Sequence, residues 1–487
     1  MLFTSLHFLI FFPIVVLLYF ALPHKIRSVW LLVSSYYFYM SWNPKYALLL
    51  AASTVITYLS GLLIAHSDTY PDKSRRILNR KMWVAISFSS SLAILFFFKY
   101  FDFAVENVNS MLSQVGIQAI SPTFDVILPI GISFYTFQAL SYSMDVYRGE
   151  IPVEKNLVKY ALFVSFFPLL IAGPIERSKN LLVQVYEKHS FDYDNAKNGL
   201  LLMIWGFFQK VVIADNVAIV VNNIYNNFWN YSGSLIALAT CLFAIQIYCD
   251  FSGYSDIAKG AAQVMGFRAV NNFNQPYFAV SIQDFWRRWH ISLSTWFRDY
   301  LYIPLGGSRC SRIKKYRNVM ITFLISGLWH GASWRFVIWG GLHGFYQIVG
   351  DIIKPYKERV NRLGFKSVPF LSMVVTFALV NLAWVFFRAP GARAALAIIN
   401  RMIFDFRPQT LFDGSLFTIW LSEMQLMTII VSILVLFIGN FLQAKMNVRE
   451  ALSRQNTLAR WSLYYSAIFA LIILGNFGTN QFIYFQF

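Results

Sequence analysis

The sequence predicts an all-α, polytopic integral-membrane protein, and composition is the first reason. Of its 487 residues, 57% are hydrophobic and only 13% are charged, whereas a soluble domain carries about 25% charged residues. So few charges cannot cover a water-facing surface, and the excess apolar surface must therefore face lipid. The second reason is that long apolar stretches alternate with short basic clusters, as they do in chains that cross a bilayer several times.

About ten to twelve apolar stretches are long enough, or nearly so, to cross a bilayer core of about 30 Å. The clearest are 6–22, 46–65, 82–100, 124–142, 158–173, 199–214, 234–249, 319–345, 370–387, 426–443 and 461–476. Several are shorter than about 20 residues, so re-entrant, broken or interfacial helices are expected as well. The first stretch has neither a basic segment before it nor a cleavage site after it. It is therefore predicted to be a retained span and not a signal peptide.

The sequence contains no internal repeat, low-complexity tract or flexible linker, so a single domain over 1–487 is expected. Its three cysteines, Cys241, Cys249 and Cys310, show no C-x-x-C spacing. They therefore predict neither a disulfide framework nor a metal site.

Lysine and arginine outnumber aspartate and glutamate by 41 to 23, a formal charge of +18. In a membrane protein such residues collect in cytoplasmic loops and beside anionic lipid head groups. Because every basic stretch has this membrane context, no nucleic-acid partner is expected. The basic clusters lie at 25–27, 73–81, 354–366 and 445–460. If all of them face the cytoplasm, both chain termini lie on the outer side, while the orientation between 174 and 318 stays open.

His330 is the first candidate for chemistry, because it lies in the apolar stretch ITFLISGLWHGASWRFVIWGGLHG. An ionisable residue in such a stretch is costly and is a functional candidate by default. Burial beside Trp329 should keep its imidazole neutral and available as a base. Glycines surround it at positions 327, 331, 340, 341 and 344. They permit either close helix packing or close approach of a substrate. The alternative role for His330 is a buried histidine that only hydrogen-bonds a neighbouring helix.

The preceding segment, SIQDFWRRWHISLSTWFRDYLYIPLGGSR, alternates tryptophan with arginine around His290. So many charges exclude a simple span and favour amphipathic, interfacial or cavity-lining helices. Arginine and lysine hold phosphate by charge-assisted hydrogen bonds, so this region could bind a nucleotide-bearing donor. A lipid head-group anchor is the alternative for its loop portion. The predicted basic donor-binding residues are Arg287, Arg288, Arg298, Arg309, Lys314, Lys315 and Arg317.

Two further segments place polar side chains among apolar residues, one in the middle of the chain and one at its C-terminus. The stretch QIYCDFSGYSDIAKG carries Asp250 and Ser252 at the end of an apolar segment, which suggests the wall of a cavity. The chain ends in GTNQFIYFQF, whose phenylalanines would seek an apolar groove around one nucleophilic group, Tyr484. The alternative is an aromatic residue at the membrane interface.

Together these segments resemble the membrane-bound O-acyltransferase family, in its bacterial alginate O-acetylation branch. The matching stretches are LPIGISFYTFQALSYSMDVYRG, FFPLLIAGPIER, IYCDFSGYSDIA, FWRRWHISLSTWFRDYLYIPLGG and LWHGASWRFVIWGGLHG. The resemblance implies a ring of tilted helices around a central funnel, in a multi-pass protein of the bacterial cytoplasmic (inner) membrane. It makes His330 the catalytic histidine and His290 the second polar position of the site. Trp329, Asp250 and Ser252 join the predicted substrate-binding residues.

The same resemblance implies acetyl-CoA as the donor substrate, with no bound cofactor, and a polysaccharide as the final acceptor. The tail 478–487 resembles a motif that carries the acyl group on its tyrosine, here Tyr484. A periplasmic or extracellular SGNH-hydrolase-like partner would then complete the transfer to sugar. The alternatives are a D-alanyl-type acyltransferase with a carrier-protein donor, a transporter or channel, and a scaffold that only recruits a periplasmic transferase.

Overall fold

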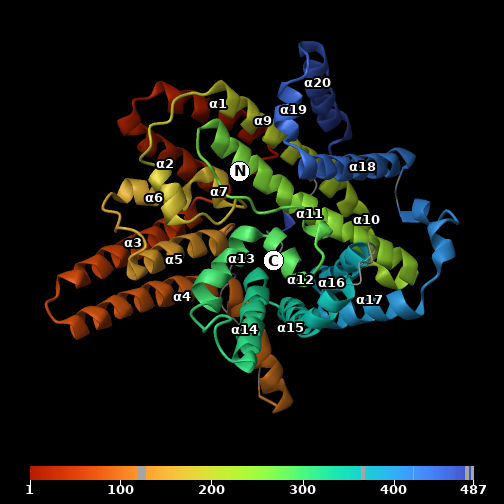
Figure 1. Ribbon diagram of the computed structural model, residues 1–487, viewed down its shortest axis with the longest axis horizontal. Helices are drawn as coiled ribbons and strands as arrows, with labels where there is room; N and C mark the ends of the chain where they lie inside the picture. The colour runs from red at the N-terminus through yellow and green to blue at the C-terminus, as the bar shows by residue number, and fades with distance from the viewer. Residues whose placement is uncertain (118–127, 363–367, 420–421, 478–481, 484–487) are drawn as a thin grey trace. The chain divides into compact units, whose positions relative to one another are not determined.

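The structure, a computed structural model, describes residues 1–117, 128–362, 368–419, 422–477 and 482–483. Within these ranges every regular element is a helix and no strand occurs (Figure 1), so the predicted all-α class is confirmed. The chain divides into two compact units, one of Met1–Gly199 with Ala261–Val270 and one of Leu200–Gly260 with Asn271–Phe487. The expected single domain over 1–487 stays a prediction.

The first unit begins with three apolar helices and ends with short ones. Its helices are α1 (Leu6–Ala21), α2 (His24–Met40), α3 (Lys45–His66), η1 (Ser67–Thr69), α4 (Lys73–Gln114), α5 (Ile132–Arg148), α6 (Leu157–Ser165), α7 (Phe167–Leu170) and α8 (Ser178–Gln184). α3, α4 and α5 lie side by side (Figure 1). Gly61 of α3 permits this packing, since a Cβ there would lie 2.7 Å from the ring of Tyr142 on α5.

The second unit contains the remaining helices, and two helices run through both units. These two are α9 (Tyr193–Phe207) and α11 (Gly233–Val264). The others are η2 (Phe208–Ala214), α10 (Asp215–Asn226), η3 (Phe228–Asn230), η4 (Pro276–Phe278), α12 (Ile282–Arg288), α13 (Ile291–Phe297), η5 (Arg298–Tyr302), α14 (Arg312–His330), α15 (Trp334–Arg362), α16 (Val368–Arg388), α17 (Ala392–Phe404), η6 (Pro408–Leu411), η7 (Ser415–Ile419), α18 (Glu423–Lys445), α19 (Val448–Ser453) and α20 (Thr457–Leu474).

Eight helices of the described ranges are long and apolar enough to cross a membrane, where about ten to twelve were expected. They are Lys45–Thr69, Lys73–Gln114, Tyr193–Asn226, Gly233–Val264, Trp334–Arg359, Pro369–Arg388, Glu423–Lys445 and Thr457–Leu474. The apolar α20 buries no residue, as expected of a helix that faces lipid. The chain is therefore a multi-pass membrane protein.

The smaller number of membrane-spanning helices has structural causes. The apolar stretch 158–173 forms the short, buried helices α6 and α7, and α5 is buried along almost its whole length. The stretch 319–345 is broken at Gly331 into α14 and α15. Composition cannot separate such internal helices from spans, because both are apolar.

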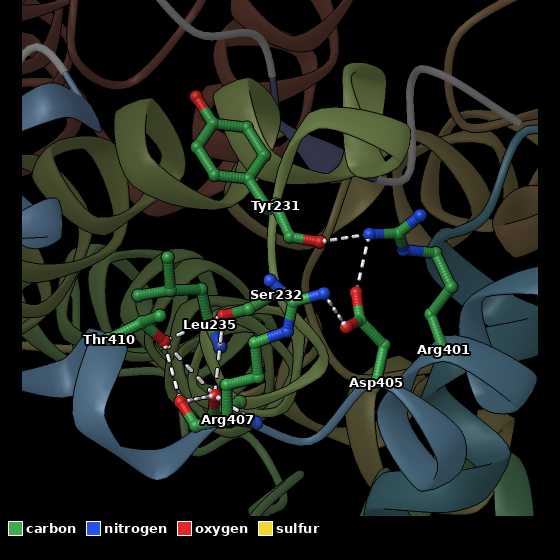
Figure 2. A network of polar contacts seen from close by, with 8 residues as sticks. Tyr231, Ser232, Leu235, Arg401, Asp405, Arg407 and Thr410 are labelled. Atoms are coloured by element: carbon green, nitrogen blue, oxygen red, sulfur yellow. Dashed lines mark hydrogen bonds and ion pairs between the residues drawn. The ribbon is translucent and has the colours of Figure 1, made fainter.

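Figure 2 shows how the segment after α17 is held against the start of α11. The Arg401 guanidinium donates a hydrogen bond to the Tyr231 carbonyl at 2.8 Å and pairs with Asp405 at 2.7 Å. Asp405 also pairs with Arg407 at 2.7 Å. The Asp405 carbonyl accepts from the Gly233 N–H at 2.9 Å. These contacts fix the first turn of α11, a helix whose later turns carry Asp250.

Candidate functional site

Two histidines that are distant in the sequence meet in the second unit. His330 is the last residue of α14, and His290 lies between α12 and α13. Only 2% of His330 and 0% of His290 are exposed. Their ring centres lie 6.4 Å apart with an interplanar angle of 62°, and we refer to them as the histidine pair.

The backbone of His290 is left-handed, with φ of 42° and ψ of 54°. This conformation costs a residue with a side chain roughly 1–2 kcal/mol and persists only where the surroundings enforce it. Asn272 contributes to this, since its carbonyl accepts from the Ile291 N–H at 2.9 Å. Its side chain accepts from Ser292 at 2.6 Å and donates to Ser255 of α11 at 2.9 Å. Burial lowers the pKa of His290 to about 3, so the ring is neutral at neutral pH.

Aromatic rings enclose the histidine pair. The ring of Trp329 lies 5.0 Å from that of His330 and 6.0 Å from that of His290, between centres. Trp339 of α15 lies 4.9 Å from His330, edge to face. Phe251 of α11 lies 4.6 Å from His290 in the same type of contact. These rings exclude water and lower the local dielectric constant, which strengthens any hydrogen bond that the pair makes with a substrate.

The position of His330 depends on close contact between α14 and α15, which lie next to each other in Figure 1. A Cβ on Gly327 would lie 2.2 Å from the carbonyl oxygen of Phe336. A Cβ on Gly340 would lie 2.2 Å from the carbonyl oxygen of Phe323. Neither distance can be accommodated without separating the helices. Gly327 and Gly340 therefore serve close helix packing, one of the two roles expected from the sequence.

A cavity of about 1350 Å³ lies in the same unit among α12, α13, α14, α15 and α16. Arg287, Arg298 and Lys315 of the predicted donor-binding set contribute to its wall. Lys315 is paired with Asp351 of α15 at 2.7 Å, and Arg298 with its neighbour Asp299 at 2.8 Å. The cavity thus combines apolar walls with cationic groups that suit a phosphate-bearing ligand.

The cavity approaches the histidine pair, and aromatic rings lie between Trp286 on its wall and His330. Ser326, one helical turn before His330, contributes to the cavity wall, as does Trp286. The Trp286 indole N–H donates a hydrogen bond to Nδ1 of His343 at 3.2 Å. Trp339 lies 5.7 Å from Trp286 and 4.9 Å from His330, between ring centres. We refer to Trp286, Trp339 and His343 as the aromatic partition.

The other basic residues of the predicted donor-binding set do not line this cavity. Arg288 pairs with Asp284 on its own helix at 2.9 Å. Arg309, Lys314 and Arg317 have exposed side chains next to the start of α14. The structure therefore brings together only part of the set that the sequence predicts as one basic run.

Asp250 and Ser252 are buried on α11. One carboxylate oxygen of Asp250 lies 2.7 Å from Nζ of Lys210, and the other accepts from the backbone N–H of Ile483 at 2.7 Å. Tyr484, predicted to carry the acyl group, lies outside the described residues, and its predicted role stays a prediction. The residues that precede it, Phe482 and Ile483, are buried in the second unit.

The sequence analysis missed several residues of this region. Lys210 lies in the apolar segment GFFQKVVIADNVAIVV, and its charge was a usable signal because buried lysines are rare. His343 lies in the same apolar stretch as His330, and its ionisable side chain was an equally usable signal. Asn272 had no signal, since its role depends on backbone groups that only the fold brings near it.

Comparison with known proteins adds independent findings. A family model described as MBOAT, membrane-bound O-acyltransferase family, matches residues 149–388, a range that includes Asp250 and the histidine pair. The chain is 39% identical over 439 residues to the probable alginate O-acetylase AlgI of Azotobacter vinelandii, covering 90% of this chain and 84% of that protein. It is 37% identical over 431 residues to the peptidoglycan O-acetyltransferase of Helicobacter pylori, covering 82% and 79%. The teichoic acid D-alanyltransferase of Bacillus subtilis is 27% identical over 270 residues, which is 53% of this chain.

Proposed function

Because this chain belongs to the membrane-bound O-acyltransferase family, we propose that it transfers acetyl groups from acetyl-CoA toward an exported or cell-wall polysaccharide. The acceptor class is supported by the names of its relatives, which act on alginate and peptidoglycan. The relatives whose name specifies D-alanyl transfer are matched over a smaller share of the chain. The observation that carries the proposal is the buried histidine pair beside a cavity whose wall includes Arg287, Arg298 and Lys315.

The cavity suits the donor in size and charge. Ligand pockets typically measure about 300–1,000 Å³, and the cavity of about 1350 Å³ leaves room for a long nucleotide-bearing thioester. Arg287, Arg298 and Lys315 would hold the phosphates by charge-assisted hydrogen bonds. The thioester would then extend along α14 past Ser326 toward His330. To reach the histidine, the acyl end has to pass the aromatic partition.

The histidine pair provides the groups that acyl transfer needs. The hydroxyl of Tyr484, with an ordinary pKa of about 10, is a weak nucleophile unless a base takes its proton. In our proposal His330 takes that proton while the tyrosine oxygen attacks the thioester carbonyl. The C–S bond breaks, and the CoA thiolate recovers the proton from His330. The neutral ring of His290, whose centre lies 6.4 Å from that of His330, would donate one N–H to the oxyanion that develops on the thioester carbonyl.

Acetyl-Tyr484 would then deliver its acetyl group on the outer side of the bacterial cytoplasmic (inner) membrane. The basic clusters support this orientation, because the C-terminus lies outside if all of them face the cytoplasm. A periplasmic or extracellular SGNH-hydrolase-like partner would collect the group on its serine and pass it to the polysaccharide. Direct transfer to the partner or the sugar, without Tyr484, is the competing route within the same function.

The test is the mass of the C-terminal peptide after the purified protein in lipid has been incubated with acetyl-CoA. The wild type should gain one acetyl group on Tyr484 and release CoA, while His330→Ala and Tyr484→Phe gain none. CoA release that needs His330 but leaves Tyr484 unmodified would support the acetyltransferase and exclude the tyrosine route. CoA release that survives His330→Ala would contradict the role of the histidine pair.

A further inference from the structure

The last described residues of the chain are bound inside the second unit. Phe482 is 0% exposed and Ile483 is 4% exposed. The Ile483 N–H donates a hydrogen bond of 2.7 Å to the carboxylate of Asp250 on α11, 233 positions earlier. Because the donor is a backbone N–H, this hydrogen bond depends on where the backbone of the tail lies and not on the identity of a side chain.

A buried ion-pair cluster orients this carboxylate. The ammonium of Lys210 lies 2.7 Å from one oxygen of Asp250 and 2.8 Å from one oxygen of Asp215. At most 6% of any of these side chains is exposed. Buried charges are costly to desolvate, and they persist where hydrogen bonds occupy their remaining lone pairs. The Ile483 N–H supplies such a bond to Asp250, so the tail is part of what completes the cluster.

The helices that carry the cluster are built for close approach at this point. Lys210 lies in η2, a π-helical segment between α9 and α10, and such segments occur frequently at functional sites. One turn earlier, Gly206 faces Gly253 of α11, where a Cβ on either residue would lie 2.6 Å from the other's carbonyl oxygen. This glycine contact brings Lys210 within reach of Asp250.

The tail also lies next to the histidine pair. The ring of Phe482 packs against Tyr254 at 4.5 Å and against Phe251 at 5.7 Å, between centres. Phe251 in turn contacts the ring of His290 at 4.6 Å. Phe251 therefore contacts both Phe482 of the tail and His290 of the histidine pair.

We propose that the cluster of Lys210, Asp215 and Asp250, with the ring pocket of Phe251 and Tyr254, is a binding site for an aromatic peptide segment, occupied by Phe482 and Ile483 of this chain's own C-terminal tail. The carboxylate of Asp250 sets the register of the tail through its backbone, and the pocket receives the phenylalanine that precedes the bound amide. Asp250 and Lys210 are then positioning residues, which act on the chemistry through the tail. The inference rests on the proposed function for what the tail carries.

The first experiment removes the hydrogen bond between Ile483 and Asp250 by changing Ile483. The side chains of the ion-pair cluster and the helices that carry it are then unaltered. Ile483→Pro lacks the backbone N–H, whereas Ile483→Val retains it. Chymotrypsin cleavage after Tyr484 is followed by mass spectrometry in the full-length protein in lipid. Each rate is divided by the rate for a free peptide of the same tail sequence. Since a hydrogen bond to a charged group is lost, Ile483→Pro should be cleaved about tenfold faster than Ile483→Val.

The second experiment changes the other partner. Asp250→Asn should also accelerate cleavage about tenfold, because it weakens the acceptor. Asp256→Asn is the matched control, since Asp256 lies on the same helix and accepts a hydrogen bond from Gln209 at 2.9 Å, whereas the described tail residue Ile483 donates to Asp250. Equal cleavage rates in Ile483→Pro and Ile483→Val would overturn the inference, whether or not Asp250→Asn folds.

Acetylation of Tyr484 separates this inference from the proposed function. If the tail is positioned for transfer, Ile483→Pro lowers the rate of acetyl uptake by Tyr484 about tenfold without changing the KM for acetyl-CoA. Ile483→Val, which retains the N–H, takes up acetyl at the wild-type rate. If wild-type Tyr484 takes up no acetyl group, the tyrosine route is wrong, and the cleavage rates still decide whether the site binds the tail. Unchanged acetyl uptake in an Ile483→Pro protein with faster cleavage would overturn the positioning role.

Discussion

The rings of His290 and His330 lie 6.4 Å apart between centres, although one belongs to a loop between two short helices and the other ends α14. The loop histidine has a left-handed backbone, and the helical one depends on glycine contacts with α15. Both positions are therefore set by backbone constraints, which are costly to maintain. Such constraints are expected where two side chains must be held in one geometry.

The first prediction concerns the backbone of His290. Replacement by glycine removes the imidazole and also the steric cost of the left-handed backbone. Replacement by alanine removes the imidazole but leaves that steric cost in place. His290→Gly should therefore be more stable than His290→Ala by about 1 kcal/mol. Thermal unfolding in detergent measures the difference, and both variants should lose acetyl transfer. A more stable alanine variant would show that the loop relaxes to another conformation.

The second prediction concerns pH. Burial lowers the pKa of His290 to about 3 in the folded protein, from about 6.5 in an unfolded chain. The stability that this neutral ring contributes is complete above the unfolded pKa and is lost as the pH falls from 6.5 toward 3. The melting temperature of the wild type should therefore fall more steeply between pH 6.5 and pH 5 than that of His290→Gln, which stays neutral. Parallel curves for the two proteins would contradict this assignment.

The third prediction concerns the contact between α14 and α15. Gly340→Ala places a Cβ 2.2 Å from a backbone oxygen, whereas Gly341→Ala meets its nearest neighbour, a leucine methyl group, at 3.5 Å. The first substitution should cost about 1–3 kcal/mol of stability and reduce CoA release, because it displaces the helix that ends at His330. The second should be close to neutral, since alanine favours the helix. Thermal unfolding and CoA release are measured together. Equal effects of the two substitutions would contradict the packing role.

The fourth prediction concerns the cavity that we propose as the donor site. Replacing Arg287 and Arg298 by glutamine removes two cationic groups from its wall. The KM for acetyl-CoA should rise about tenfold or more, because charge-assisted hydrogen bonds to phosphate contribute about 1.5–3 kcal/mol each. Lys314→Gln is the control, since that side chain is exposed and does not line the cavity. A KM that rises only with the control would place the donor on the exposed basic run.

The limits of sequence reasoning are clearest in the donor-binding set. The sequence presents Arg287 to Arg317 as a region rich in basic residues, and one-dimensional spacing cannot separate residues on a cavity wall from residues in solvent. The structure places Arg287, Arg298 and Lys315 on the wall and leaves Arg309, Lys314 and Arg317 outside it. The separation depends on which face of each helix meets its neighbours, and this is decided by packing between elements.

Sequence alone determined the helical membrane class, because apolar length and low charge are local properties that a bilayer selects directly. It also determined His330 as a candidate, since a histidine among glycines and tryptophans in an apolar stretch is costly wherever the chain folds. The resemblance already named His290 as the second polar position of the site. Only the tertiary structure decided that its ring lies 6.4 Å from that of His330, that internal helices replace some expected spans, and that the carboxylate of Asp250 meets both Lys210 and the Ile483 N–H. The physical reason is that these relationships join residues far apart along the chain. Their contacts follow from helix packing and from the satisfaction of buried polar groups, and no periodicity in the sequence records them.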